Sequence, residues 1–118
     1  MARLQITIVT DAGARVGPGK AALLESVQST GSISAAARAM DMDYKRAWML
    51  IDSLNRAFVT PVVERSTGGA GGGGARLTPF GQDLLDRYRQ IREAAERIAK
   101  AHLRTLERRA AADPGAKV

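Results

Sequence analysis

The sequence has no cysteine and a single histidine, His102. Without cysteine, a disulfide framework and any zinc or iron–sulfur site built on thiolates are excluded, and one histidine is too few for a cluster of imidazole ligands. No apolar run approaches the ~18 residues that a membrane-spanning helix needs, and the first residues are too polar for a signal peptide. We therefore expect a soluble protein of a reducing compartment, the cytoplasm, with no metal or cofactor.

Aromatic side chains are also scarce, at 4% of 118 residues, although hydrophobic residues reach 45%. This composition is typical of one domain with an aliphatic, alanine-rich core. The net charge of +6 makes a polyanion such as nucleic acid the first partner class to consider. Residues 1–76 and 77–118 each carry nine basic and six acidic side chains, so the charge is not concentrated in one segment and does not by itself establish nucleic-acid binding.

The first thirty residues predict a hairpin followed by a helix. Residues 4–9 alternate with period two and are rich in β-branched side chains, which indicates a strand, and residues 14–16 are placed to return as a short second strand. Pro18 suits the first turn of a helix. That helix is expected from Lys20 to Thr30, with Gly31 as its C-terminal stop.

Residues 32–58 have the pattern of a helix-turn-helix. Ser32 or Ser34 can cap a first, alanine-rich helix that extends to Met40. Residues 41–43 interrupt it, and Asp43 is placed to cap the next helix. A second helix is expected from Tyr44 to about Phe58, because apolar residues recur on one face at spacings of four, three and four. That arrangement directs Lys45, Met49, Asp52 and Arg56 outward and places Trp48 on a flank.

Two further strands, at 62–66 and 75–78, enclose a glycine-rich loop at 68–74. Two strands joined by such a loop directly after a helix-turn-helix are typical of the wing of a winged helix. The strand that begins at Leu4 is expected to pair with this hairpin in a three-stranded sheet. The loop also matches a G-x-G-x-x-G pattern, but a strand and Pro79 follow it instead of a helix, so we do not expect nucleotide binding.

A helix of about thirty residues is predicted from Phe80 to about Arg109. Apolar and small residues recur along it at alternating spacings of four and three, which is the pattern of a helix–helix seam. The seam consists of Leu84, Tyr88, Ile91, Ala95, Ile98 and His102. At ~1.5 Å per residue this helix is too long to bury its stripe against its own domain, so we expect a homodimer, with parallel and antiparallel pairing both open. His102 is then an interface residue and not a catalytic one.

The same residues carry a resemblance to a known family. The runs Gly31–Arg38, Tyr44–Trp48, Val63–Ala75 and Leu77–Gly81 are similar to the N-terminal DNA-binding domain of ModE-type molybdate-responsive transcription regulators and, more distantly, to the winged helix of LysR-type regulators. The resemblance implies a DNA-binding, dimerising unit. Full ModE regulators carry molybdate-binding modules after the long helix, whereas this sequence stops at Val118, so molybdate binding by this chain is not expected.

Each candidate DNA-contacting residue also has a structural interpretation. Lys45 and Arg46 lie in the first turn of the second helix, which in this motif enters the major groove, although either can contact phosphate alone. Trp48 can pack on the preceding helix or face DNA. The serines can cap a helix, contact phosphate, or do both. The arginines that flank the glycine loop, Arg65 and Arg76, can pair with Glu64 or another carboxylate, or bind DNA. The predicted set is Ser32, Ser34, Arg38, Tyr44, Lys45, Arg46, Trp48, Met49, Arg56, Arg65 and Arg76.

The sequence therefore predicts a mainly helical α+β fold: a winged helix-turn-helix domain at 1–79, a dimerisation helix at 80–109 and a flexible tail at 110–118. The predicted function is sequence-specific binding of double-stranded DNA by a homodimeric bacterial transcription regulator, with molybdenum-related genes as candidate targets. The alternative is a winged-helix module for protein contacts without sequence-specific DNA binding. No catalytic constellation is present, and an enzyme is not expected.

Overall fold

The computed structural model describes residues 1–66 and 74–116, and its element order confirms the predicted fold class. The elements are β1 (Ile8–Val9), β2 (Arg15–Val16), α1 (Pro18–Thr30), α2 (Ile33–Ala39), α3 (Tyr44–Ala57), β3 (Val63–Ser66), β4 (Gly74–Leu77), α4 (Pro79–Arg108) and a short 3₁₀ turn η1 (Pro114–Ala116). Of the predicted glycine loop at 68–74, only the last residue lies within the described residues.

The helix ends follow from local side-chain and backbone chemistry. Gly31 closes α1 in the left-handed region, at φ 76°, which favours glycine. The Ser32 hydroxyl accepts a hydrogen bond from the backbone N–H of Ala35 at the start of α2. The Asp43 carboxylate does the same for the N–H of Arg46 at the start of α3. Both caps satisfy N–H groups that have no partner inside their helix.

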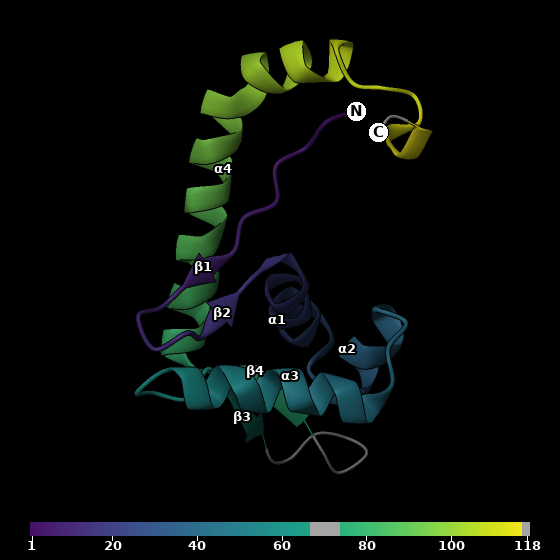
Figure 1. The fold of residues 1–118 in the computed structure, drawn as a ribbon. Coiled ribbons are helices and arrows are strands. Elements are labelled where there is room, and N and C mark those ends of the chain that lie inside the picture. The colour runs from purple at the N-terminus through teal and green to yellow at the C-terminus, as the bar shows by residue number, and fades with distance from the viewer. Residues whose placement is uncertain (67–73, 117–118) are drawn as a thin grey trace.

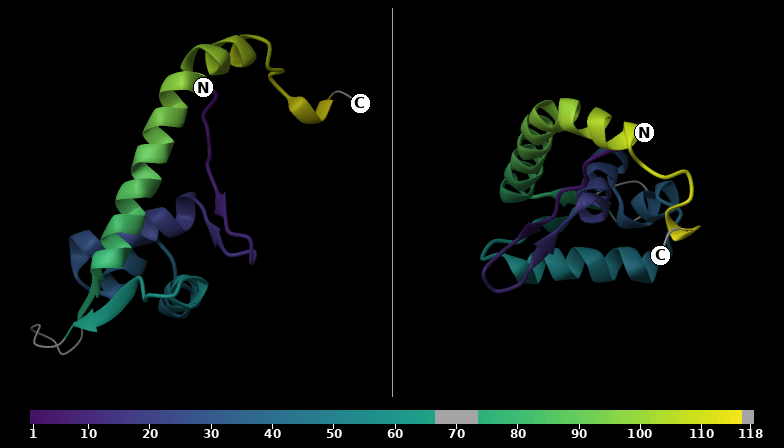
Figure 2. Two further views of the ribbon diagram at one scale, coloured as in Figure 1. Left: turned by 90° about the vertical axis from the view of Figure 1, so that its left-hand side faces the viewer. Right: turned by 45° about the horizontal axis from the view of Figure 1, so that its top comes forward.

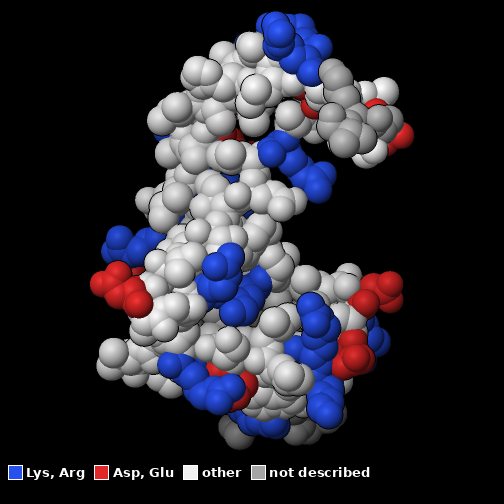
Figure 3. Space-filling view, viewed as in Figure 1, with Lys and Arg blue, Asp and Glu red and all other residues white. Residues whose placement is uncertain are grey.

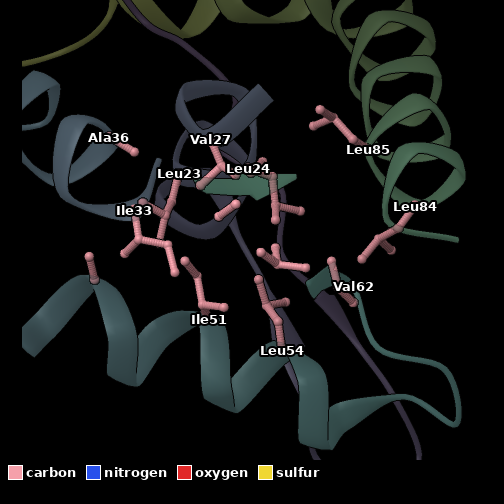
Figure 4. Packing of buried hydrophobic residues seen from close by; sticks show 14 of the residues in the cluster. Leu23, Leu24, Val27, Ile33, Ala36, Ile51, Leu54, Val62, Leu84 and Leu85 are labelled. Atoms are coloured by element: carbon pink, nitrogen blue, oxygen red, sulfur yellow. The ribbon is translucent and has the colours of Figure 1, made fainter. Parts of the chain in front are cut away.

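The core lies where α1 is surrounded by α2, α3, the wing strands and the first turns of α4. In Figure 4, Ile51 and Leu54 of α3 point toward Leu23 and Ile33, while Leu84 lies near Val62 on the opposite side. These residues are buried, and their burial removes apolar surface from water, which is the main force that holds helices together. The core is built mainly from leucine, isoleucine, valine and alanine, as the low aromatic content of the sequence predicts.

The predicted three-stranded sheet is wrong. The described strands form two separate antiparallel pairs, β1 with β2 and β3 with β4. Of the predicted strand at 4–9, only Ile8 and Val9 pair. The residues before them run along α4 instead, where the Tyr88 hydroxyl donates to the carbonyl oxygen of Ile6 at 2.7 Å. This contact leads the chain away from the wing, so the first strand cannot add to β3–β4.

Helix α4 has 30 residues and belongs to the core only at its beginning. Its buried residues are all in the first ten positions, from Gly81 to Tyr88, and the rest of the helix projects from the domain (Figure 1). The molecule consequently measures 54 × 27 × 25 Å. Figure 2 shows the helix rising above the other elements, with the N-terminal segment on the same side as its far end. No described helix has the length and apolar character needed to cross a membrane.

Candidate nucleic-acid interface

Helix α3 presents two different faces. Ala47, Ile51 and Leu54 are buried against the core, as their spacing predicts. Lys45 and Met49 lie on the opposite side and are exposed, with Met49 at 63%. The helix therefore offers solvent a polar surface next to one large apolar side chain, a combination that can donate to base edges and contact a thymine methyl group.

The link between α2 and α3 is short and well bonded. Met40 to Asp43 connect the two helices, and the N–H of Met42 donates to the carbonyl oxygen of Ala37 at 2.9 Å. Asp41 adopts φ 53°, a left-handed conformation that aspartate tolerates better than most side chains. The turn fixes α3 against α2, as the helix-turn-helix interpretation requires.

The strands at the base of the wing, β3 and β4, are attached to the helix-turn-helix. The N–H of Ala75 in β4 donates to the carbonyl oxygen of Gly31, at 2.9 Å, directly before α2. A Cβ on Gly74 would collide with the Ser66 hydroxyl and lie 3.3 Å from the carbonyl oxygen of Gly31, so glycine allows this close approach. On the other side, the Asn55 side chain of α3 bonds to the backbone at the start of β3. The wing strands are thus held between the α1–α2 turn and α3.

Two hollows lie beside the exposed face of α3. The first, of about 350 Å³, is formed where α2, α3, β3 and β4 meet, and none of its lining residues is acidic. Its polar lining residues are Ser32, Ser34, Tyr44 and Arg65. The second, of about 360 Å³, is lined by Asp43, Lys45, Arg46, Met49 and Leu50. The structure therefore places seven of the predicted DNA-contacting residues in the linings of these two depressions.

Several of the other predicted cations have partners within the chain. Arg56 pairs with Asp52 at 2.9 Å, and Arg76 pairs with Glu64 at 2.9 Å. Arg38 is exposed, and its guanidinium donates to the Ser34 hydroxyl at 3.5 Å. These contacts are at the surface, where an ion pair is worth about 0–1 kcal/mol and can be exchanged for a phosphate.

Lys45 and Arg46 differ from Arg56 and Arg76. Within residues 1–66 and 74–116, neither has an acidic side chain within ion-pairing distance. On the face shown in Figure 3, Lys and Arg side chains gather in the lower part of the molecule, where α3 lies, with acidic side chains beside them. Unlike Arg56 and Arg76, the two helix cations can therefore engage an added anion without giving up an ion pair within the described residues.

Trp48 and Arg65 have a different environment from the rest of the set. Trp48 is half-buried and packs against the core. The Arg65 guanidinium lies over its indole ring, 4.9 Å from the ring centroid. The sequence indicates a carboxylate such as Glu64, or DNA, as the partner of Arg65, and gives no sign of this contact with Trp48. Nor does it predict the contacts of Asn55, whose only sequence signal is a polar residue near the end of an amphipathic helix.

The residues of the predicted seam on α4 lie in two different environments. Leu84 and Tyr88 are buried in the core of their own chain, at 9% and 2% exposure, so a partner helix cannot reach them, and their place in the predicted interface is corrected. Ile91 and Ile98 are exposed at 46% and 76%. His102 is also exposed and Ala95 is half-buried, and the predicted role of these four residues remains a prediction.

A second apolar feature accompanies the far half of α4. A groove of about 620 Å³ lies between residues 1–4 and the helix, and Leu4 and Leu103 contribute to its lining. The terminal amine of Met1 pairs with Glu107 at 3.4 Å across it. Neither Ile91 nor Ile98 lines this groove, so the exposed seam and the groove are separate surfaces.

These features define a winged helix-turn-helix protein: two helices joined by a tight turn, a hairpin anchored beside the second helix, and a long helix that follows. Residues 20–82 match the bacterial regulatory helix-turn-helix protein, lysR family, and the chain belongs to this family. The family is one of transcription regulators, and the DNA-binding class predicted from the sequence is confirmed.

Comparison with individual proteins supports the same assignment. The chain is 40% identical over 94 residues to the molybdenum-pterin-binding protein MopB of Rhodobacter capsulatus, covering 80% of this chain and 35% of that protein. It is 46% identical over 71 residues to the transcriptional regulator ModE of Yersinia pestis, covering 60% and 27% respectively. The resemblance to ModE-type regulators is therefore confirmed, although the chain spans only about a third or less of these relatives.

The fold is also found in a solved structure. The crystal structure of a MarR family transcription regulator superposes with a TM-score of 0.60 at 23% identity, over 78% of this chain and 62% of that one. At this identity the similarity concerns the fold alone. It agrees with the winged helix-turn-helix architecture derived from the elements above.

Proposed function

We propose that this chain acts in the bacterial cytoplasm as the sequence-specific DNA-binding part of a homodimeric transcription regulator. In this proposal α3 lies in the major groove, with Lys45 and Arg46 near base edges and the first hollow of α2, α3 and the wing next to a phosphate. The observation that carries the proposal is the exposed, cationic first turn of α3 on a helix whose other face is fully buried. Affinity would come mainly from phosphate contacts and specificity from this helix.

The proposed targets are genes connected with molybdenum. This extension comes from the relatives, which are named for molybdenum transport and for molybdenum–pterin binding. We do not extend molybdate binding to this chain. The similarity covers only a part of each of these relatives.

The DNA-binding proposal is tested by replacing both helix cations. We expect Lys45→Ala with Arg46→Ala to abolish preference for the target sequence and to leave the fold intact, because both side chains are exposed. The target is first obtained by sequencing DNA pulled down with the protein. Affinity for that site and for a scrambled site is then measured between 50 and 200 mM salt (about the range over which phosphate contacts are lost).

A matched control keeps the charge change and moves it away from α3. Arg97→Ala with Lys100→Ala removes two exposed cations from the far half of α4, and we expect it to keep the preference for the target. Parent protein that binds DNA with a log–log salt slope of about −0.9 per neutralised phosphate supports a DNA-binding function. Parent protein that binds no DNA at any salt favours the alternative module for protein contacts, and a double α3 variant that still selects the target refutes the role of α3.

The homodimer is supported by the exposed isoleucines of α4. Replacing Ile91 and Ile98 together with aspartate would place unpaired charges in the proposed interface, and we expect a dimer to become a monomer. Val59→Asp with Thr60→Asp, at two exposed positions outside α4, is the control for added charge. Light scattering that gives a monomer mass for the parent protein would refute the dimer. A two-fold dimer is expected to bind inverted half-sites about one helical turn, or a multiple of it, apart.

A further inference from the structure

The contact between Trp48 and Arg65 joins the helix proposed to read DNA to the wing beside it. Trp48 lies in α3, one turn after its first residue, and Arg65 lies in β3. The guanidinium is 4.9 Å from the indole centroid, within the ~6 Å range of a cation–π interaction, and tryptophan is the best aromatic partner for one. Because the indole also packs on the core, its position is set independently of the arginine.

A second attachment between α3 and β3 lies two helical turns further on. The Asn55 amide oxygen accepts from the N–H groups of Val62 and Val63 at 2.7 and 3.0 Å, and its amide nitrogen donates to the carbonyl of Val63 at 3.1 Å. Asn55 lies seven positions after Trp48 in α3, which corresponds to ~10 Å along the helix axis. Two contacts at this separation fix the direction of β3 relative to α3, whereas Asn55 alone fixes only one point.

The register of β3 explains why Arg65 reaches the indole. Successive side chains of a strand point to opposite faces, so Arg65 is on the same face as buried Val63. Glu64 points to the other face, where it pairs with Arg76. Arg65 thus continues the inward face of the strand beyond the core and meets α3 instead of an acidic side chain.

We propose that Arg65 is a positioning residue, which stacks on Trp48 and holds the wing at a fixed angle to α3, so that wing and helix meet DNA as one rigid unit. This inference rests on the proposed function and adds to it a determinant of specificity that does not need to touch a base. A wing held in place contributes its DNA contacts at a high effective concentration, whereas a wing released from α3 must be ordered during binding.

The competing explanation is a direct contact between Arg65 and phosphate. The two explanations differ in their dependence on Trp48. A positioning role is lost when either partner is replaced, and replacing both then costs no more than replacing one. A phosphate contact is lost only with Arg65, is indifferent to Trp48, and lowers the salt slope by about 0.9 for each contact removed.

The first experiment is a double-mutant cycle with Trp48→Leu, Arg65→Gln and the double variant, measured on the target site and on a scrambled site. We expect each variant to weaken target binding by about three- to tenfold, with equal losses in all three. Trp48→Phe, which keeps an aromatic ring, is expected to recover most of the affinity, and the salt slope of Trp48→Leu is expected to equal that of the parent. Additive losses, with a lower salt slope only when Arg65 is replaced, would overturn the positioning role. Urea unfolding of each variant confirms that the compared proteins are folded.

The second experiment needs no DNA and separates this inference from the proposed function. Hydrogen exchange of the free protein is followed in peptides that cover residues 63–66 and 74–77. We expect faster exchange there in Trp48→Leu and in Arg65→Gln, and no change in α1. Glu64→Gln is the matched control, since it removes the neighbouring ion pair on the other face of β3 and leaves Trp48 and Arg65 in contact.

The outcomes are distinct. If exchange in the wing strands is the same in the parent, Trp48→Leu and Arg65→Gln, the positioning role is overturned whether or not the protein binds DNA. If exchange responds as expected and the parent binds no DNA, the DNA-binding function is overturned while the link between α3 and the wing stands.

Discussion

Gly81 supports the sharpest test of the fold, because the start of α4 passes directly over the backbone that enters the wing. Thr78 caps the helix by accepting from the N–H of Gly81 at 2.9 Å, and its hydroxyl donates to the carbonyl oxygen of Pro61 at 2.6 Å. The N–H of Thr78 donates to the carbonyl oxygen of Val62 at 3.0 Å. A Cβ added to Gly81 would overlap that same oxygen and lie 3.0 Å from the carbonyl carbon of Val62.

The cost of Gly81→Ala can be estimated from these contacts. The obstacle is backbone, which cannot turn away as a flexible side chain does, so the first turn of α4 must shift. Forcing a methyl group into a packed site costs about 1–3 kcal/mol, and losing one hydrogen bond of the Thr78 cluster adds about 1 kcal/mol. Alanine returns at most about 1 kcal/mol through its higher helix propensity. We therefore expect a net loss of about 1–3 kcal/mol in the free energy of unfolding.

Gly19→Ala is the matched control. Gly19 is the second residue of α1, it is exposed, and no atom lies within 4 Å of the Cβ that alanine would add. The same substitution is therefore expected to be neutral or to stabilise by up to about 1 kcal/mol.

The two variants and the parent are compared by urea unfolding at one protein concentration, because association would make the apparent stability depend on concentration. With a slope of about 1–3 kcal/mol per molar urea, the expected loss moves the midpoint of Gly81→Ala down by roughly 1 M. An unchanged or higher midpoint for Gly81→Ala, or equal shifts for both glycines, would show that the close approach of α4 to the wing does not exist in solution.

Three further substitutions test contacts of the interface and of α4. Asn55→Ala is expected to cost about 2 kcal/mol in thermal or urea unfolding, because two N–H groups at the start of β3 lose their acceptor; a loss under about 0.5 kcal/mol would show that water replaces the amide without penalty. Asp43→Ala is expected to lower the free energy of unfolding by about 1 kcal/mol through loss of the α3 cap, and to weaken binding to target DNA. Its control, Asp52→Ala, lies at an exposed position on the same helix and should leave the free energy of unfolding within about 0.5 kcal/mol of the parent. Burial raises the pKa of the Tyr88 hydroxyl, so the folded state retains that proton more strongly than the unfolded state does. The contribution of Tyr88 to stability is therefore complete below the unfolded pKa of ~10 and is lost as pH rises through the folded pKa. Tyr88→Phe should remove this alkaline loss and expose residues 1–7 to faster hydrogen exchange, while Tyr44→Phe, at an exposed tyrosine, should do neither.

Local signals in the sequence predict most of the elements. Capping of α3 by Asp43, termination of α1 at Gly31 and the apolar stripe of α3 all depend on residues at most a few positions apart, and each appears in the structure as predicted. Of the two serines that could cap α2, the structure selects Ser32. The boundaries of α3 and α4 agree with the prediction to within one residue, because Pro79 and Asp43 mark their starts with specific backbone chemistry. Interactions of this range are determined by the chain almost independently of its tertiary contacts.

The contacts between distant segments could not be predicted in the same way. Alternation at residues 4–9 indicates an extended segment with one apolar face, but it does not specify which surface that face will meet. The decisive contact is the hydrogen bond from Tyr88 to the carbonyl of Ile6, across 82 positions of sequence. Dependence on distant contacts also explains the error in the predicted α4 seam. A regular heptad spacing does not distinguish Leu84, which is buried in its own core, from Ile98, which is exposed.

The arginines at the proposed interface show how sequence distance governs what can be predicted of a charged side chain. Arg56 pairs with Asp52 four positions away, a contact that helical spacing alone predicts. Arg76 pairs with Glu64, which requires the register of β3 on β4 as well, and Arg65 meets Trp48, which requires the placement of a strand on a helix. Each cation that finds a partner in the chain must give it up or share it before it can bind phosphate. Lys45 and Arg46 have no such partner among the described residues. DNA binding therefore costs them less than it costs Arg56 or Arg76, and for that physical reason their removal is a direct test of the proposed function.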